Sequence, residues 1–97
     1  MNEEEREAYN RIRAYIMSNI DATIQAGQEP KEEDCWITQS QMVTRLMLMM
    51  MPTKEDAERI GLSALRKAYR LGVIEFGKTD DGENKFKYKY INMPKNE

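Results

Sequence analysis

The segment that decides the fold is LRKAYRLGVIEFGKTDDGENKFKYKYI, residues 65–91. Its first part continues a stripe of apolar side chains that begins at Ala57 and recurs every three or four positions, as in an amphipathic helix. Gly72 predicts the end of that helix, because glycine readily adopts the left-handed conformation found there. Residues 73–76 then predict a strand, and Asp81–Gly82 predicts a hairpin turn before a strictly alternating strand. The segment therefore predicts a helix that leads directly into a β-hairpin.

Upstream of this segment, the sequence predicts further helices. One stripe of apolar side chains at helical spacing consists of Tyr9, Ile12, Ile16, Ile20 and Ile24. Either Thr38 or Ser40, two residues later, can cap another helix, and Thr38 and Gln41 have the spacing of a capping box. This helix is predicted to start just after a short β-prone segment, residues 36–38. In all, we expect helices over residues 3–26, 39–50 and 54–71, a charged loop over 27–35, and antiparallel pairing of 73–76 with 85–91.

The order helix, short extended segment, helix, helix, strand, turn, strand resembles the winged helix-turn-helix family of DNA-binding domains. Trp36–Ser40 resembles the family's short first strand as it enters the second helix. Leu65–Ile74 resembles the end of its recognition helix, where a Leu-Gly-Val-Ile run turns into the first wing strand. Residues 77–84 would form the wing tip and residues 85–91 the returning strand.

The resemblance implies an α+β fold, mostly α: a winged helix of three helices plus a C-terminal β-hairpin wing. It implies a single domain over residues 1–97, with a core over residues 8–92 and a polar tail over residues 93–97. Two features depart from the usual pattern of the family. The stretch before the turn at residues 51–53 is unusually apolar, and the third helix is longer than many recognition helices. Both leave the docking geometry open.

The composition narrows the class of function. The chain has no histidine, which removes the commonest general base and the commonest zinc ligand, and its one cysteine, Cys35, cannot form an intrachain disulfide. We therefore expect a protein that is not an enzyme and has no cofactor or metal site. The acidic N-terminus lacks the layout of a secretory signal, and no apolar run approaches the ~20 residues that cross a bilayer. We expect a cytoplasmic protein without a membrane partner.

The net charge of −2 is unevenly distributed. Residues 1–34 carry nine acidic and four basic side chains, whereas residues 35–97 carry eight acidic and eleven basic ones. This split favours a domain with one positive surface. The candidate DNA-binding residues on the predicted third helix are Lys54, Arg59, Ser63, Arg66, Lys67 and Arg70, and those on the hairpin are Lys78, Lys85, Lys87 and Lys89.

These basic residues have chemistry suited to DNA. Arginine makes bidentate contacts with guanine edges and with phosphates, and lysines on a wing suit phosphate contacts. The same side chains could instead form a solvated helix face and a charged edge strand that resists aggregation. Against the DNA interpretation, three acids lie in the same hairpin: Asp80, Asp81 and Glu83.

Residues 47–51 are five consecutive apolar residues. Consecutive residues of a helix point in different directions, so a monomer cannot bury all five side chains in its core. We interpret Leu48, Met49 and Met51 as contacts to a second copy of the chain or to another protein, because methionine-rich surfaces adapt to partners. In the alternative interpretation, Met47 and Met50 fill the core. Trp36 is expected to anchor the core, and Cys35 is expected to be structural.

Two functions from different classes remain open. In the first, the protein binds double-stranded DNA as a dimer and acts as a transcriptional or replication regulator. In the second, the same fold is a protein-interaction module, such as an adaptor or a phage-type inhibitor of a nucleic-acid-processing complex. The acidic first helix and the methionine run favour the second, and fold likeness alone does not decide between them.

Overall fold

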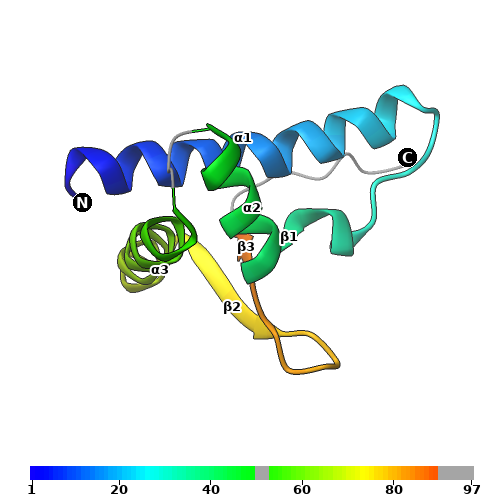
Figure 1. Cartoon of the computed structure of the whole chain (residues 1–97). Coiled ribbons are helices and arrows are strands. Elements are labelled where there is room, and N and C mark those ends of the chain that lie inside the picture. Colours follow the sequence, from blue (N-terminus) through cyan, green and yellow to red (C-terminus); the bar gives the residue numbers. More distant parts are fainter. Residues whose placement is uncertain (50–52, 90–97) are drawn as a thin grey trace.

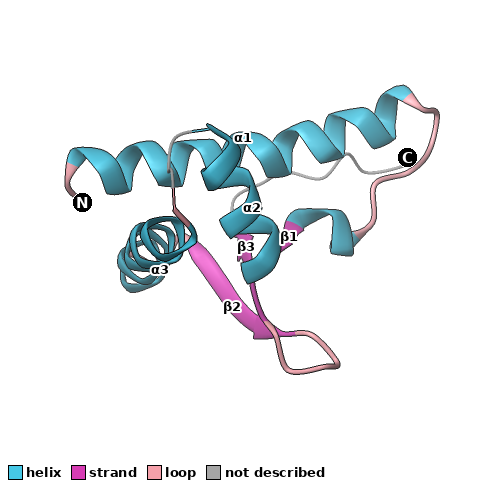
Figure 2. Ribbon diagram, in the orientation of Figure 1, coloured by secondary structure: helices cyan, strands magenta, loops and turns pink. Residues whose placement is uncertain are grey.

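The computed structural model describes residues 1–49 and 53–89 (Figures 1 and 2). It is an α+β structure, mostly helical, with three helices and a small antiparallel sheet. The elements in chain order are α1 (Glu3–Gln25), the short 3-10 helix η1 (Glu32–Cys35), β1 (Trp36–Thr38), α2 (Gln39–Met49), α3 (Lys54–Arg70), β2 (Ile74–Lys78) and β3 (Asn84–Tyr88). The expected class, the helices and the hairpin are confirmed, while residues 90 and 91 of the expected last strand lie outside the described residues.

The charged segment before β1 differs from the prediction. Residues 27–35 were expected to form a loop, but Glu32–Cys35 forms one turn of 3-10 helix. The turn is closed by two hydrogen bonds, because the Lys31 amide donates to Asp34 Oδ2 at 2.8 Å and the Asp34 amide donates to the Lys31 carbonyl at 3.0 Å. An aspartate that caps the backbone in this way stabilises a local turn without any apolar periodicity.

Side-chain caps fix where the helices begin. At α2, the Gln41 amide donates to Thr38 Oγ1 at 3.2 Å and the Thr38 amide donates to Gln41 Oε1 at 2.9 Å, which confirms the predicted capping box. At α3, the Asp56 amide donates to Thr53 Oγ1 at 3.1 Å. Asn2 forms a further capping box with Glu5 at the start of α1.

The sheet has the strand order β1-β3-β2, so the last strand lies between the other two. Ile37 of β1 and Phe76 of β2 are both partners of Phe86 of β3. The turn between β2 and β3 contains Gly82 at φ 88°, a left-handed conformation that glycine adopts without strain. This hairpin projects away from α1 and extends beyond the helices (Figure 1).

The core lies where the three helices meet one face of the sheet. Its fully buried larger side chains are Ile12 and Ile16 of α1, Cys35, Ile37 of β1, Met42 and Leu46 of α2, Leu65 of α3 and Ile74 of β2. Within the described residues, none of the helices is both long and apolar enough to cross a membrane. Two apolar residues that continue the predicted helical stripes are exposed: Ile24 near the end of α1 and Leu71, which follows the last residue of α3.

Candidate nucleic-acid interface

The exposed face of α3 carries an arginine row, defined as Arg59, Arg66 and Arg70. All three side chains are exposed, and at about 100° per residue they point within about 40° of one another around the helix axis. Arg59 forms an ion pair with Asp56 at 3.2 Å. Among residues 1–49 and 53–89, no ion pair involves Arg66 or Arg70. Their guanidinium groups are therefore available to a ligand.

Ser63 and Lys67, predicted as part of the same interface, are turned towards α1. Ser63 Oγ donates to Glu5 Oε2 at 2.5 Å, and Lys67 Nζ donates to Glu5 Oε1 at 2.7 Å. Glu5 is only 3% exposed. Its hydrogen bonds with Lys67 and Ser63 lower the pKa of its carboxyl group from 4.5 to about 2. Lys67 and Ser63 thus join α1 to α3, whereas Lys54 is exposed at the start of α3.

The hairpin lysines fall into two groups. Lys85 and Lys87 were expected to line a solvent-exposed face, but both are partly buried beside Trp36, which lies on that outer face of the sheet. Lys85 Nζ is 4.5 Å from the centre of the Trp36 ring, a cation–π contact. Lys87 Nζ is 3.1 Å from Glu32 Oε1 and 3.9 Å from Glu75 Oε2. Lys78 and Lys89 are exposed.

Trp36 was expected to be a core anchor, and this expectation is wrong. Trp36 is the partner of Lys87 in the β1–β3 register, whereas its neighbour Ile37 is the partner of Phe86 on the core face. The indole reaches across β3 to β2, because a Cβ added at Gly77 would lie 3.3 Å from a ring carbon of Trp36. The small residue at position 77 therefore leaves room for the indole on the outer face.

The turn of the hairpin is negatively charged. Glu83 accepts a hydrogen bond from Ser40 Oγ at 2.6 Å, and this bond lowers the pKa of its carboxyl group. Asp81 accepts a hydrogen bond from Thr79, which lowers the pKa of Asp81 as well. Both carboxylates stay ionised at neutral pH and would repel a phosphate placed at the turn, where Asp80 is also exposed.

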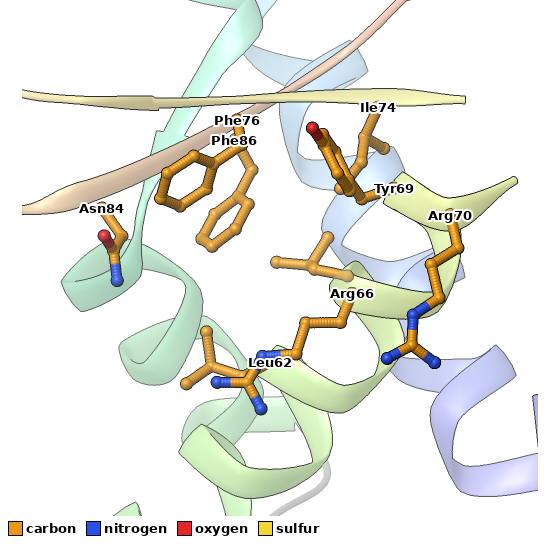
Figure 3. A pocket seen from close by; sticks show the side chains of 9 residues that line it. Leu62, Arg66, Tyr69, Arg70, Ile74, Phe76, Asn84 and Phe86 are labelled. Atoms are coloured by element: carbon orange, nitrogen blue, oxygen red, sulfur yellow. The ribbon is translucent and has the colours of Figure 1, made fainter. Parts of the chain in front are cut away.

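A groove runs between α3 and the hairpin (Figure 3), and we call it the α3–β2 groove. Its volume is about 470 Å³. Its lining residues are Leu62, Leu65, Arg66, Tyr69, Arg70, Ile74, Phe76, Asn84 and Phe86. Figure 3 shows the rings of Phe76 and Phe86 on the hairpin side and the guanidinium groups of Arg66 and Arg70 on the α3 side. Two members of the arginine row, Arg66 and Arg70, thus border an apolar groove.

The end of α2 exposes three consecutive apolar side chains. Met47 is 42% exposed, Leu48 is 74% exposed and Met49 is 46% exposed. The interpretation that Met47 fills the core is therefore wrong, and its neighbour Leu46 is buried instead. The predicted contact Met51 and the alternative core residue Met50 lie outside the described residues.

Sequence reasoning missed the aromatic side chains of the groove. Tyr69 is 58% exposed and Phe76 is 50% exposed, and neither was among the candidate site residues. The signal available was the alternation of Ile74 and Phe76, which puts both on one face of β2. The alternation does not show that Ile74 is buried and Phe76 is half exposed, because that depends on how the hairpin packs against α3.

No protein-family model matches the sequence, and comparisons with curated proteins and with solved structures found no match. The site is therefore interpreted from its own residues.

Proposed function

We propose that the protein is a winged-helix module that binds duplex DNA and acts as a transcriptional or replication regulator. The order of helices and strands and the sheet order β1-β3-β2 support the winged-helix assignment. In that arrangement α3 is the recognition helix, and β2 and β3 form the wing. A helix of this kind enters the major groove of B-DNA, which is wide enough to admit it.

The observation that carries the proposal is the arginine row on α3. Arg66 and Arg70 are exposed, lie one turn apart and form no ion pair among the described residues. An arginine presents a planar fork of donors that fits the O6 and N7 atoms of guanine or two phosphate oxygens. Arg59 and Lys54 lie nearer the start of the same helix, where they would contact the phosphate backbone.

The wing contributes less than its lysine content suggests. Lys87 is held by Glu32 and Glu75, so moving it to a phosphate would break these contacts. Lys78 and Lys89 are the exposed cations of the hairpin, and we assign them the wing's phosphate contacts. The acidic turn would then point away from the DNA backbone.

The experiment is a fluorescence anisotropy titration with random-sequence duplex DNA. We expect the wild-type affinity to fall by orders of magnitude between ~50 and ~200 mM salt, because phosphate contacts release counterions. Replacement of Arg66 by alanine should cost about 1–3 kcal/mol if that side chain contacts a base. Arg13→Ala, an exposed arginine on α1, removes the same charge outside the proposed interface and should have little effect.

Two results would contradict the proposal. One is a wild-type protein that does not bind duplex DNA at ~50 mM salt, where phosphate contacts are strongest. The other is equal binding by wild type, Arg66→Ala and Arg13→Ala, because binding would then not depend on α3.

A further inference from the structure

The α3–β2 groove exposes more apolar surface than the DNA proposal uses. Leu65, Ile74 and Phe86 are buried beneath it, while Tyr69 and Phe76 are about half exposed along it. Phe76 is held in place by an edge-to-face contact with Phe86, with the ring centres 5.7 Å apart. A ring fixed in this way loses little conformational entropy when a ligand covers it, so the groove is largely preformed.

The charges along the groove are all of one sign. Arg66 and Arg70 line it, and none of the described residues that line it is acidic. The nearest acid of β2 in sequence, Glu75, lies on the opposite face of the sheet beside Lys87. An occupant of the groove that carries anionic groups can therefore pair them with these two guanidinium groups.

The combination of apolar lining and arginines selects the class of partner. Tyr, Phe and Arg are the residues enriched in the buried centres of protein interfaces. Phosphates of a nucleic acid would satisfy the arginines but would leave Leu62, Tyr69 and Phe76 uncovered. An amphipathic peptide helix covers both, because it offers apolar anchors on one face and flanking carboxylates.

We propose that the α3–β2 groove is a docking site for an acidic amphipathic segment of a partner protein. Apolar anchors of the segment cover Leu62, Tyr69 and Phe76, and its carboxylates pair with Arg66 and Arg70. This site stands on the groove's own geometry, so it holds whether or not the arginine row binds duplex DNA.

The test uses the full chain and three labelled probes in anisotropy titrations. The first is a helical peptide with Leu and Phe at i, i+4 and i+7 and with flanking Glu residues. The second peptide carries Lys at every Glu position, and the third probe is single-stranded DNA. We expect the Glu peptide to bind and the Lys peptide to bind at least about tenfold more weakly, as like charges oppose docking.

Variants locate the binding on the groove. Phe76→Ala and Tyr69→Ala should each weaken binding of the Glu peptide about tenfold or more, as expected for central aromatic contacts. Leu71→Ala removes an even more exposed apolar side chain outside the groove and should change nothing. The double variant Arg66→Glu/Arg70→Glu should reverse the preference, so that the Lys peptide binds better. Thermal melts monitored by circular dichroism check that each variant is folded.

Three results would overturn the proposal. One is no binding of the Glu peptide by the folded wild type. Another is equal binding of the two peptides, or binding that the two aromatic variants leave unchanged. The third is single-stranded DNA that binds more tightly than the Glu peptide and is lost in Phe76→Ala, because the groove would then take unstacked bases. A titration of Phe76→Ala with duplex DNA tests the arginine row separately. Failure of the groove proposal can then be distinguished from failure of the DNA-binding proposal.

Discussion

Glu5 is the buried charged side chain of the described residues, and it holds the N-terminus of α1 against α3. It accepts hydrogen bonds from the Asn2 amide, from Ser63 and from Lys67. These donors balance the cost of removing its carboxylate from water. The residues concerned are far apart in the sequence, so Ser63 and Lys67 looked like members of a DNA-binding face when only their helical spacing was considered.

We predict that ionisation of Glu5 makes the free energy of unfolding depend on pH in the acidic range. The pKa of its carboxyl group is about 2 in the folded protein against 4.5 for an unperturbed glutamate. A lowered pKa stabilises the folded state above about pH 4.5, and this contribution is lost as the pH falls towards 2. In urea titrations, Glu5→Gln should be less stable at neutral pH, and its stability should decline less over this range.

The matched control for Glu5 is Glu4→Gln, which removes the same charge from an exposed neighbour. Its stability should follow the wild-type profile. An identical acid decline in wild type and Glu5→Gln would show that another group is responsible.

At the scale of elements, local signals were sufficient to predict the order and most boundaries. Thr38 and Thr53 each cap a helix, because the side-chain oxygen accepts a hydrogen bond from the backbone amide three residues later. Such short-range chemistry can be read directly from the sequence. Gly82 likewise has to be in the hairpin turn, because few other residues adopt its positive φ. The same local reasoning placed Arg66 and Arg70 on the exposed face of α3.

What could not be predicted depends on contacts between distant elements. Trp36 is in a strand of three residues, too short to show which face is buried, and its side is set by pairing with Lys87. Leu46 and Met47 are adjacent in the sequence and both apolar, and the packing of α2 on α3 decides which of them is buried. The α3–β2 groove, too, depends on how the hairpin packs against α3.

We predict that Gly61 is needed for the close approach of α2 and α3. A Cβ at this position would lie 2.8 Å from Met42 Sδ and 2.9 Å from Leu46 Cδ1. Gly61→Val should destabilise the fold by about 1–3 kcal/mol in urea unfolding, as expected for overpacking a core. In a Met42→Ala background the cost of Gly61→Val should be smaller, because the alanine removes the side chain that it meets. Equal costs in both backgrounds would contradict this explanation.

At the scale of the whole molecule, the end of α2 forms an exposed apolar surface. We predict that this surface mediates a homodimer. A dimer would place two α3 helices on successive half-sites of DNA. Sedimentation equilibrium at micromolar concentration should give twice the chain mass for the wild type and the chain mass for Leu48→Glu. Met17→Glu, which alters an exposed apolar residue on α1, should remain dimeric.

A wild-type protein that sediments as a monomer would contradict the dimer. The arginine row would then have to bind DNA as one copy, and its affinity would rest on a single recognition helix.

The central position of β3 has a consequence for how the protein is made. β1 is complete by residue 38, but its partner strand begins at Asn84, so β1 has no strand to pair with until the hairpin has been synthesised. Phe86 and Tyr88 also supply core side chains, and the Tyr88 hydroxyl donates to the Tyr9 carbonyl of α1 at 2.9 Å. Helices can form as each leaves the ribosome, whereas long-range pairing has to wait. A nascent chain that stops before residue 84 therefore lacks both the strand that pairs with β1 and the core side chains of Phe86 and Tyr88.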